Sequence, residues 1–409
     1  MMYEIAQTEE TTVFERMLRQ RVLAQLDALR DGHIRLEDAC GSVDLGRPGA
    51  APVVQVWVTS PQFYQAVAAG GSVGAGEAYM AGHWHTDDLV GLVRVLVRNR
   101  DVLDGLETGW ARFAGGALRG WHWLRRNSEA GSRRNIAAHY DLGNDFFSLF
   151  LSTDQMYSAA YWEGAQDTLE AASRRKLDLV CRRLKLTAQD HLIEIGSGWG
   201  ALAVHAAAHY GCRVTTTTIS HEQYTATCDR IVRAGVAQRV TVLLEDYRNL
   251  TGTYDKLVSI EMIEAVGAHY LDAYFSKVGQ LLKPHGLALI QAITIEDHRY
   301  QQALRAVDFI KRHVFPGSFI PSVAAVLAAK TRASDLALVE LEDFGISYAR
   351  TLAAWRERFR SRLAQVRTLG FDERFVRLWD FYLAYCEGGF RERSIGVAHL
   401  LFAKPGYRP

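Results

Sequence analysis

Three glycines at alternate positions stand where a predicted strand ends and a predicted helix begins. They are Gly196, Gly198 and Gly200 in the segment LIEIGSGWGALAVHAAA. Glycine at such a position lets the backbone turn tightly and approach a ligand closely. A dinucleotide site would have the spacing GxGxxG and an acid at the end of the next strand. The spacing here is GxGxG and the next strand ends in Thr217 and Thr218, which disfavours a dinucleotide.

Acidic residues occur at two further points around this glycine loop. Glu194 lies within the strand just before the loop, and Glu245 and Asp246 end the third predicted strand, VTVLLED. Methyltransferases commonly place at the end of that third strand the acid that binds the adenine amino group. Together these residues predict a site for S-adenosylmethionine. The alternative is a strand-to-helix turn that binds nothing.

The segments that carry these residues alternate between strand-like and helical runs. Predicted strands are DHLIEIG, RVTTTTI, VTVLLED, YDKLVSIEM and GLALIQAIT, and helical segments separate them. Strands separated by helices of this length indicate repeated βαβ units with right-handed crossovers. The sequence therefore predicts a doubly wound, Rossmann-like α/β domain with a mostly parallel sheet. A loop, FPGSFIPS, and the amphipathic segment TLAAWRERFRSRLAQVRTLG follow it.

The N-terminal region has a different pattern. Apolar residues recur at helical spacing from Val13 to Leu29, and the runs HIRLEDA and PVVQVWV are strand-like. Gly, Ser, Arg and Trp are mixed between Gly115 and Arg134, which is typical of a connector. We expect a small α+β domain over residues 1–115, a linker over 116–138, and a methyltransferase domain over 139–409 with helical additions at its C-terminal end.

Composition excludes several classes of function. The 409 residues carry a formal net charge of only +1, so bulk charge gives no reason to expect nucleic-acid binding. Five cysteines without CxxC spacing favour a reducing compartment over a disulfide framework. The sequence has no stretch of about 18 uninterrupted apolar residues. We expect a cytoplasmic protein whose contact with the inner face of the membrane is peripheral.

Beyond these local patterns, the chain resembles the cyclopropane fatty acid synthases, which include the mycolic acid methyltransferases. The resemblance is collinear from about His139 to the C-terminus, and GEAYMAGHWHTDDL resembles the lipid-facing N-terminal domain of the phospholipid-acting members. The matching strings are HYDLGNDFFSLFL, MYSAAYW, LIEIGSGWGALA, TISHEQ, LLEDYRNL, SIEMIEAVG, LLKPHGLALIQAI, FPGSFIPS and CEGGFRER, together with Tyr348–Leu352 and Trp355.

The resemblance implies a site for S-adenosylmethionine and roles for single residues. The three loop glycines would line the methionine part of the cofactor, and Tyr157 and Ser158 would close over it. Thr218 and Gln223 would lie near the ribose, and Glu245 with Asp246 would hold the adenosine. For Ser158 and Thr218, a hydroxyl that bonds only to nearby backbone is an equal alternative.

The reaction of the family passes through a carbocation on the acyl chain, formed when a cis double bond attacks the sulfonium methyl. The protein must exclude water and surround the cation with aromatic faces, although core packing is the alternative for each aromatic residue. The candidates are Tyr140, Phe147, Tyr161, Trp162, Tyr270, Phe315 and Tyr348.

Ring closure in the family uses a bound bicarbonate as base, held by a Cys, a Glu, a His, a backbone group near an Ile, and a Tyr. Glu264, Ile293 and Tyr348 retain their positions here, whereas Ala159 replaces the Cys and Gln291 the His. One interpretation is that the altered pocket still positions bicarbonate. The other, which we favour, is a weakened or relocated base that gives a methyl-branched or methylene product without a ring.

The expected partners are phospholipid acyl chains and the membrane surface. A basic and aromatic segment fits an interfacial role, and a solvated face is its alternative. Its residues are Arg119, Trp121, Trp123, Arg125, Arg126, Arg133 and Arg134. The family suggests a homodimer or larger oligomer. A non-catalytic lipid- or cofactor-binding protein is the main alternative to an enzyme. A zinc site has no support, because the one histidine pair at ligand spacing, His205 and His209, lacks the Glu of HExxH.

Overall fold

The computed structural model describes residues 12–106 and 142–408, and its chain forms two compact units that interleave along the sequence. The first contains residues 1–124, 306–314 and 359–394, and the second contains residues 125–305, 315–358 and 395–409. The sequence division treats each domain as one continuous stretch, whereas helices from the C-terminal third belong to the first unit. The predicted linker, 116–138, lies outside the described residues, as do the Arg and Trp segment and Tyr140.

The first unit is built on a four-stranded sheet with the order β2-β1-β3-β4. Its strands are β1 (His33–Asp38), β2 (Gly41–Gly46), β3 (Val53–Val58) and β4 (Trp84–Thr86). Its N-terminal helices are α1 (Val13–Leu26), α2 (Gln62–Met80), α3 (Leu89–Arg98) and α4 (Arg100–Leu106). The helix predicted from Val13 and the strands predicted in HIRLEDA and PVVQVWV are confirmed.

Three helices from far along the chain complete this unit. They are α13 (Phe309–His313), α16 (Leu363–Thr368) and α17 (Glu373–Arg391). Gly76 in α2 shows how closely they pack, because a Cβ added there would lie 2.5 Å from the Phe309 ring. Glycine is therefore needed at this contact, which joins residues more than two hundred positions apart in sequence.

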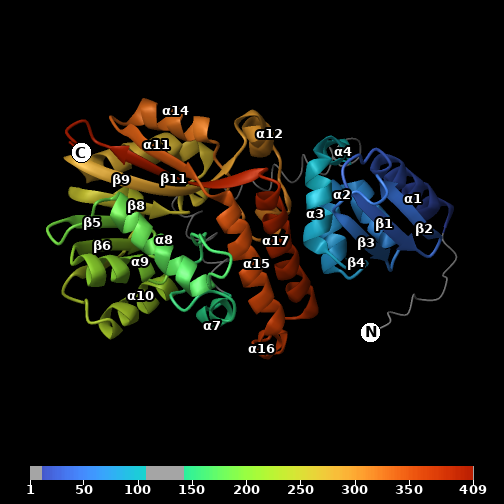
Figure 1. Cartoon of the computed structure of the whole chain (residues 1–409), viewed down its shortest axis with the longest axis horizontal. Helices are drawn as coiled ribbons and strands as arrows, with labels where there is room; N and C mark the ends of the chain where they lie inside the picture. Colours follow the sequence, from blue (N-terminus) through green and yellow to red (C-terminus); the bar gives the residue numbers. More distant parts are fainter. Residues whose placement is uncertain (1–11, 107–141, 409) are drawn as a thin grey trace. The chain divides into compact units, whose positions relative to one another are not determined.

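The second unit has a seven-stranded sheet with the order β10-β11-β9-β8-β5-β6-β7 (Figure 1). Strands β9, β8, β5, β6 and β7 are parallel to one another. Strand β11 pairs antiparallel with β9 on one side and with the edge strand β10 on the other. Their bounds are β5 (His191–Ile195), β6 (Arg213–Thr218), β7 (Val240–Leu244), β8 (Tyr254–Ile260), β9 (Leu282–Ile295), β10 (Ala337–Asp343) and β11 (Ile395–Ala403). The predicted, mostly parallel doubly wound sheet is confirmed.

Helices cover both faces of this sheet (Figure 1). Alternate residues of a strand point to opposite faces, so Ile193 joins the core beneath α11 and α14, and Leu192 joins the core beneath α8, α9 and α10. The longer helices are α8 (Leu169–Arg183), α10 (His221–Arg233), α11 (Leu271–Leu281), α14 (Val323–Ala333) and α15 (Gly345–Ser361). The short ones are α7 (Asn144–Ser148), α9 (Ala201–His205), η1 (Ala206–Tyr210), η2 (Tyr247–Asn249), η3 (Ile263–Ala265), η4 (Ala268–Tyr270), η5 (Asp297–Arg299) and α12 (Tyr300–Arg305).

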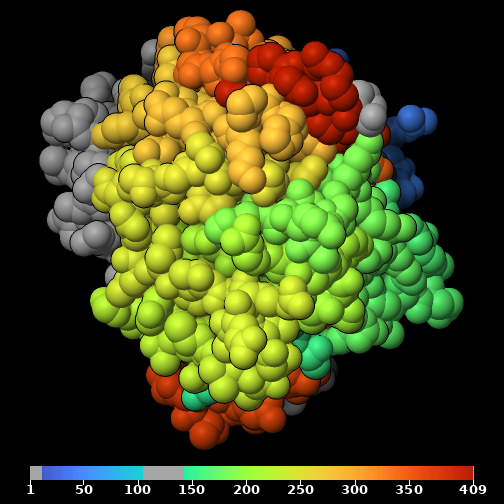
Figure 2. Space-filling view, turned by 90° about the vertical axis from the view of Figure 1, so that its left-hand side faces the viewer, coloured from blue at the N-terminus to red at the C-terminus, as the bar shows by residue number. Residues whose placement is uncertain are grey.

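The chain end folds back along the second unit. Backbone N–H groups of Lys404 and Gly406 donate to the carbonyls of Gly286 and Pro284, and the Lys185 ammonium lies over the Tyr407 ring. Figure 2 shows this C-terminal segment (red) beside α8 (green) on one face. Within the ranges 12–106 and 142–408, no helix has the length and hydrophobicity to cross a membrane.

The order of the strands determines where a ligand site can form. From β5 the chain winds outward through β6 and β7 and then returns to β8, which pairs with β5 on its other side. Ligands of open α/β sheets bind at the carboxyl ends of strands where the winding reverses in this way. Gly196 follows β5 directly and Glu261 follows β8 directly, so both lie at this point.

Candidate active site

The glycine loop adopts backbone conformations that only glycine accepts without strain. Gly196, Gly198 and Gly200 have φ angles of 96°, 51° and 81°. A Cβ on Gly200 would lie 2.7 Å from a methyl of Thr227, whereas one on Gly198 would meet no atom within 4 Å. The loop is thus packed against α10 on one side and leaves space beside its backbone on the other.

Two residues predicted to surround the cofactor, Thr218 and Ser158, form hydrogen bonds with other side chains. Thr218 donates a 2.9 Å hydrogen bond to Oε1 of Gln223, and Ser158 accepts one of 2.8 Å from the buried Lys176 ammonium. Burial lowers the pKa of Lys176 to about 8. These two hydroxyls therefore bond to side chains rather than serving only the nearby backbone.

The two acids after β7 are placed differently from one another. The buried carboxylate of Asp246 pairs with the Arg248 guanidinium at 2.7 Å and accepts the backbone N–H of the same residue at 3.0 Å. Glu245 is half-buried, and its backbone carbonyl accepts a hydrogen bond from Thr217. Of the pair, the Glu245 side chain is the more accessible.

An aromatic cluster joins the glycine loop to α15. Tyr157 lies at its centre, with ring centroids 5.2 Å from Phe147, 5.3 Å from Trp355 and 6.4 Å from Phe315. The further contacts are Phe147 with Trp199 of the glycine loop at 5.2 Å and Trp355 with Tyr348 at 6.1 Å. Three of the predicted aromatic residues, Phe147, Phe315 and Tyr348, thus belong to one cluster.

Other aromatic candidates lie outside this cluster. Tyr161 donates to Glu342 and packs against Phe344. The Trp162 indole N–H donates to Thr351, and the Arg350 guanidinium lies 4.5 Å from its ring centroid. Tyr270 packs against the core beneath α11.

The carboxylate of Glu261 gathers three of the residues predicted for the anion pocket. It accepts hydrogen bonds from the backbone N–H of Ala159 at 2.9 Å, from Nε2 of Gln291 at 2.7 Å and from the Tyr348 hydroxyl at 2.8 Å. Glu261 has a φ of 48°, an uncommon value for a residue with a side chain. The sequence interpretation missed this residue, although SIEMIEAVG contains two glutamates three positions apart after a predicted strand.

A chain of buried polar groups orients the Gln291 amide. Arg183 donates to Nδ1 of His399 at 2.7 Å, and Nε2 of that histidine lies 2.9 Å from Oε1 of Gln291. Burial and the Arg183 charge hold the pKa of His399 well below its usual value, so the ring is neutral and donates from Nε2. The amide nitrogen is then directed at Glu261.

Glu264 pairs with Ile293, whereas the resemblance implies that each of them holds a bicarbonate ion. Its Oε1 accepts the Ile293 backbone N–H at 2.5 Å, while its buried Oε2 has no hydrogen-bond partner among the described residues. Burial, followed by the nearby charge of Glu261, raises the pKa of Glu264 to about 8. Burial also raises the pKa of Glu261, against the opposing effect of its three donors and Lys176. Both residues lie deep in the protein yet remain partly accessible.

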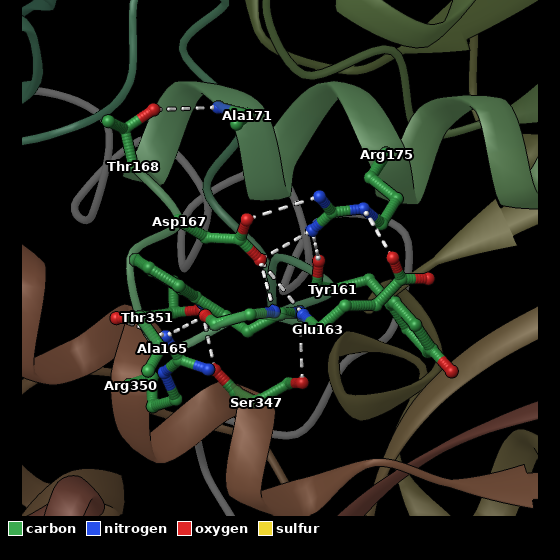
Figure 3. Close-up of polar contacts among 12 residues, drawn as sticks. Tyr161, Glu163, Ala165, Asp167, Thr168, Ala171, Arg175, Ser347, Arg350 and Thr351 are labelled. Carbon is green, nitrogen blue, oxygen red and sulfur yellow. Dashed lines mark hydrogen bonds and ion pairs between the residues drawn. The ribbon is translucent and has the colours of Figure 1, made fainter.

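Polar contacts hold the loop that carries Ala159 (Figure 3). Arg175 of α8 pairs with Asp167 at 2.7 Å and donates to the Tyr161 carbonyl at 3.2 Å. On the α15 side, Arg350 donates to the Gly164 carbonyl at 2.6 Å, and the buried Thr351 hydroxyl accepts the Ala160 N–H at 3.1 Å. The backbone N–H that reaches Glu261 is thus fixed from two helices.

These residues fit S-adenosylmethionine better than they fit bicarbonate. The glycine turn leaves space beside its backbone, with aromatic rings, hydroxyls and acids around it, as this cofactor requires. A bicarbonate ion would need the donors at positions 159, 291, 293 and 348. Each of them already donates to Glu261 or Glu264, so the arrangement does not fit a second anion.

Comparison with known proteins identifies the family of this chain. The fold and the glycine loop define an S-adenosylmethionine-dependent methyltransferase. The family model for mycolic acid cyclopropane synthetase matches residues 127–400, and the chain belongs to that family.

Two relatives cover most of the chain. Tuberculostearic acid methyltransferase UfaA1 of Mycobacterium tuberculosis is 39% identical over 82% of this chain and 80% of its own length. Cyclopropane-fatty-acyl-phospholipid synthase of Escherichia coli K12 is 35% identical over 87% of this chain and 89% of its own. Among solved structures, cyclopropane synthase MmaA2 of M. tuberculosis superposes with a TM-score of 0.62 at 28% identity, covering 66% of this chain and 98% of that one.

Proposed function

We propose that this enzyme transfers a methyl group from S-adenosylmethionine to the double bond of an unsaturated acyl chain in a phospholipid. The observation that carries the proposal is the meeting of a glycine loop after β5 with two half-buried glutamates after β8, Glu261 and Glu264. The E. coli relative is named for action on fatty acyl phospholipids. A non-catalytic lipid-binding protein would need neither the glycine turn nor these two carboxylates.

S-adenosylmethionine, when bound, supplies an electrophilic methyl group that the alkene π electrons attack, which leaves a cation on the acyl chain. The rings of Tyr157, Phe315 and Trp355 lie together beside the glycine loop. Aromatic faces stabilise cations by roughly 0.5–2 kcal/mol each and exclude water that would capture them. Tyr348 extends this surface to Glu261. We assign these residues the protection of the cation.

The proposed product is methyl-branched or carries a methylene group, without a ring. Ala159 and Gln291 replace the Cys and His that the family resemblance places in the base pocket, and their donors face Glu261. A base in a changed position favours loss of a different proton. The relative UfaA1 is named as a methyltransferase rather than a cyclopropane synthase, which supports this product.

We also propose peripheral membrane contact and an oligomeric state, as the family resemblance suggests. The Arg and Trp segment expected to touch the membrane lies outside the described residues. Binding to anionic vesicles by the full chain, compared with a variant in which Arg125 and Arg126 are glutamine, tests the contact. Sedimentation of the full chain tests the oligomer.

The decisive experiment supplies S-adenosylmethionine labelled in its methyl group together with vesicles of a cis-monounsaturated phospholipid. We expect label in the acyl chains, and mass spectrometry should identify a branched or methylene product. Vesicles with saturated chains are the control and should take up no label. Label in saturated vesicles or head groups would refute acyl double bonds as the acceptor, and a cyclopropane as the main product would refute the product assignment.

A further inference from the structure

The Glu261 carboxylate occupies the position that the family resemblance gives to a bound bicarbonate ion. The resemblance places bicarbonate among the groups at positions 159, 264, 291, 293 and 348. In this chain the groups at 159, 291 and 348 converge on Glu261 at 2.7–2.9 Å. The three donors come from a loop, a strand and a helix that are far apart in sequence. Their convergence defines an anion site that the protein fills with its own side chain.

We propose that the Glu261 carboxylate is the base that removes the proton from the acyl cation, in the place of a bound bicarbonate. This proposal rests on the proposed function, because it assumes that methyl transfer to a double bond creates the cation. It adds a residue that neither the sequence patterns nor the resemblance assigned, and it predicts a reaction that needs no bicarbonate.

Electrostatics favours the Glu261 carboxylate over a bound bicarbonate ion as the base. A bicarbonate ion at this point would stand beside the Glu261 carboxylate, and like charges at short range in a poorly solvated site repel strongly. The donors that would offset this repulsion are already engaged. A tethered carboxylate also avoids the loss of translational freedom that binding a free ion costs.

Glu261 is better placed than Glu264 to carry the negative charge. Three hydrogen bonds and the attraction of Lys176 stabilise its anion, whereas Glu264 receives the Ile293 N–H. With a pKa raised to about 8, Glu264 keeps its proton near neutral pH. Burial raises the pKa of both carboxyl groups, but at Glu261 three hydrogen bonds and Lys176 oppose the rise, so Glu261 is the better base of the two.

The proposed step balances as follows. A C–H bond on a carbon next to the cationic carbon breaks, and its electron pair forms a new C=C bond with that carbon. The proton passes to a carboxylate oxygen of Glu261, which becomes a neutral acid. If the broken C–H bond belongs to the new methyl group, the electron pair closes a ring while the cation is on the neighbouring chain carbon. If a hydride has first shifted between the two chain carbons, so that the methylated carbon carries the cation, the same electron pair forms a methylene group instead. Release of the proton to solvent restores the carboxylate, and no oxidant or reductant is needed.

Two substitutions separate the base from a structural role. Glu261→Gln keeps the shape of the side chain and removes its basicity. Glu261→Gly removes the side chain, and because φ is 48° at this position glycine adopts the native backbone without strain. Glu261→Gly also leaves the Ala159, Gln291 and Tyr348 donors facing an open space that a small anion could enter.

The test measures the rate of formation of the deprotonated, methylated lipid in carbonate-free buffer and with millimolar bicarbonate. We expect the wild type to be indifferent to bicarbonate. Both variants should lose about 10²- to 10⁴-fold in rate, the usual contribution of a general base. Bicarbonate should restore part of the rate to Glu261→Gly and none to Glu261→Gln, whose amide still fills the site.

Calorimetry with S-adenosylmethionine shows whether each variant retains a folded cofactor site. A wild type that requires bicarbonate would overturn the proposal. So would a Glu261→Gln variant that binds the cofactor and forms the product at the wild-type rate. If the wild type methylates no unsaturated lipid in either buffer, the proposed function fails rather than the role of Glu261.

Discussion

Gln291 donates a 2.7 Å hydrogen bond from Nε2 to the carboxylate of Glu261. The bond joins the residue that directly follows β8 to a residue of β9, and Ile260 and Gln291 are direct neighbours in register. The other end of the same amide accepts from His399. The amide therefore connects two buried groups that would each lose a partner without it.

Gln291→Leu should lower turnover and destabilise the protein. Leucine has a similar size but neither donates to Glu261 nor accepts from His399, and a buried polar group without a partner costs about 1–3 kcal/mol. Thermal unfolding and the rate of lipid methylation measure the two effects. Gln280→Leu is the matched control, because that exposed amide only bonds to Ser276 on α11. Equal behaviour of the two variants would contradict the role of the buried amide.

Glu264→Gln should change how stability depends on pH. The pKa of Glu264 is raised from 4.5 to about 8 in the folded protein. Between these values the unfolded chain has released the proton that the folded protein retains, so the free energy of unfolding falls as pH rises. The variant lacks this effect. Its melting temperature should therefore rise relative to that of the wild type between pH 5 and pH 8. A difference in melting temperature that does not change with pH would show that Glu264 titrates normally.

Gly200→Ala should weaken cofactor binding and stability together. Its Cβ would lie 2.7 Å from Thr227, and φ is 81° at this position. Gly235→Ala is the control, since φ is 69° there and a Cβ would meet no atom within 4 Å. We expect the control to lose only the roughly 1–2 kcal/mol of a left-handed residue and to bind S-adenosylmethionine normally. Calorimetry and melting curves distinguish the two, and similar losses in both would mean that the Thr227 contact is unimportant.

Thr351→Val should loosen the loop that positions Ala159. The Thr351 hydroxyl accepts from the Ala160 N–H at 3.1 Å and from the Trp162 indole N–H at 2.9 Å. Valine keeps the volume but leaves two donors unpaired, at about 1–3 kcal/mol each if both stay buried. Thr351→Ser keeps the hydroxyl and should be nearly as stable as the wild type. Equal melting temperatures for the two variants would argue against this anchor.

Local patterns were sufficient to predict the cofactor loop. The residues from Ile193 to Gly200 are contiguous, and a strand followed by a glycine turn and a helix is encoded by neighbours in sequence. The parallel sheet followed in the same way from the alternation of segments. The strands β10 and β11 were not predicted, because β11 pairs with the distant β9, with Ile395 opposite Ile295, and β10 pairs in turn with β11.

What the sequence by itself determined is the class of enzyme, through the glycine loop and the ordered family strings. Only the tertiary structure decided which carboxylate the pocket surrounds. Sequence position pointed to Glu264, whereas Ala159, Gln291 and Tyr348 meet at Glu261 because a loop, a strand and a helix converge beside the end of β8. A hydrogen bond depends on distance and direction in space, and spacing along the chain specifies neither for residues so far apart.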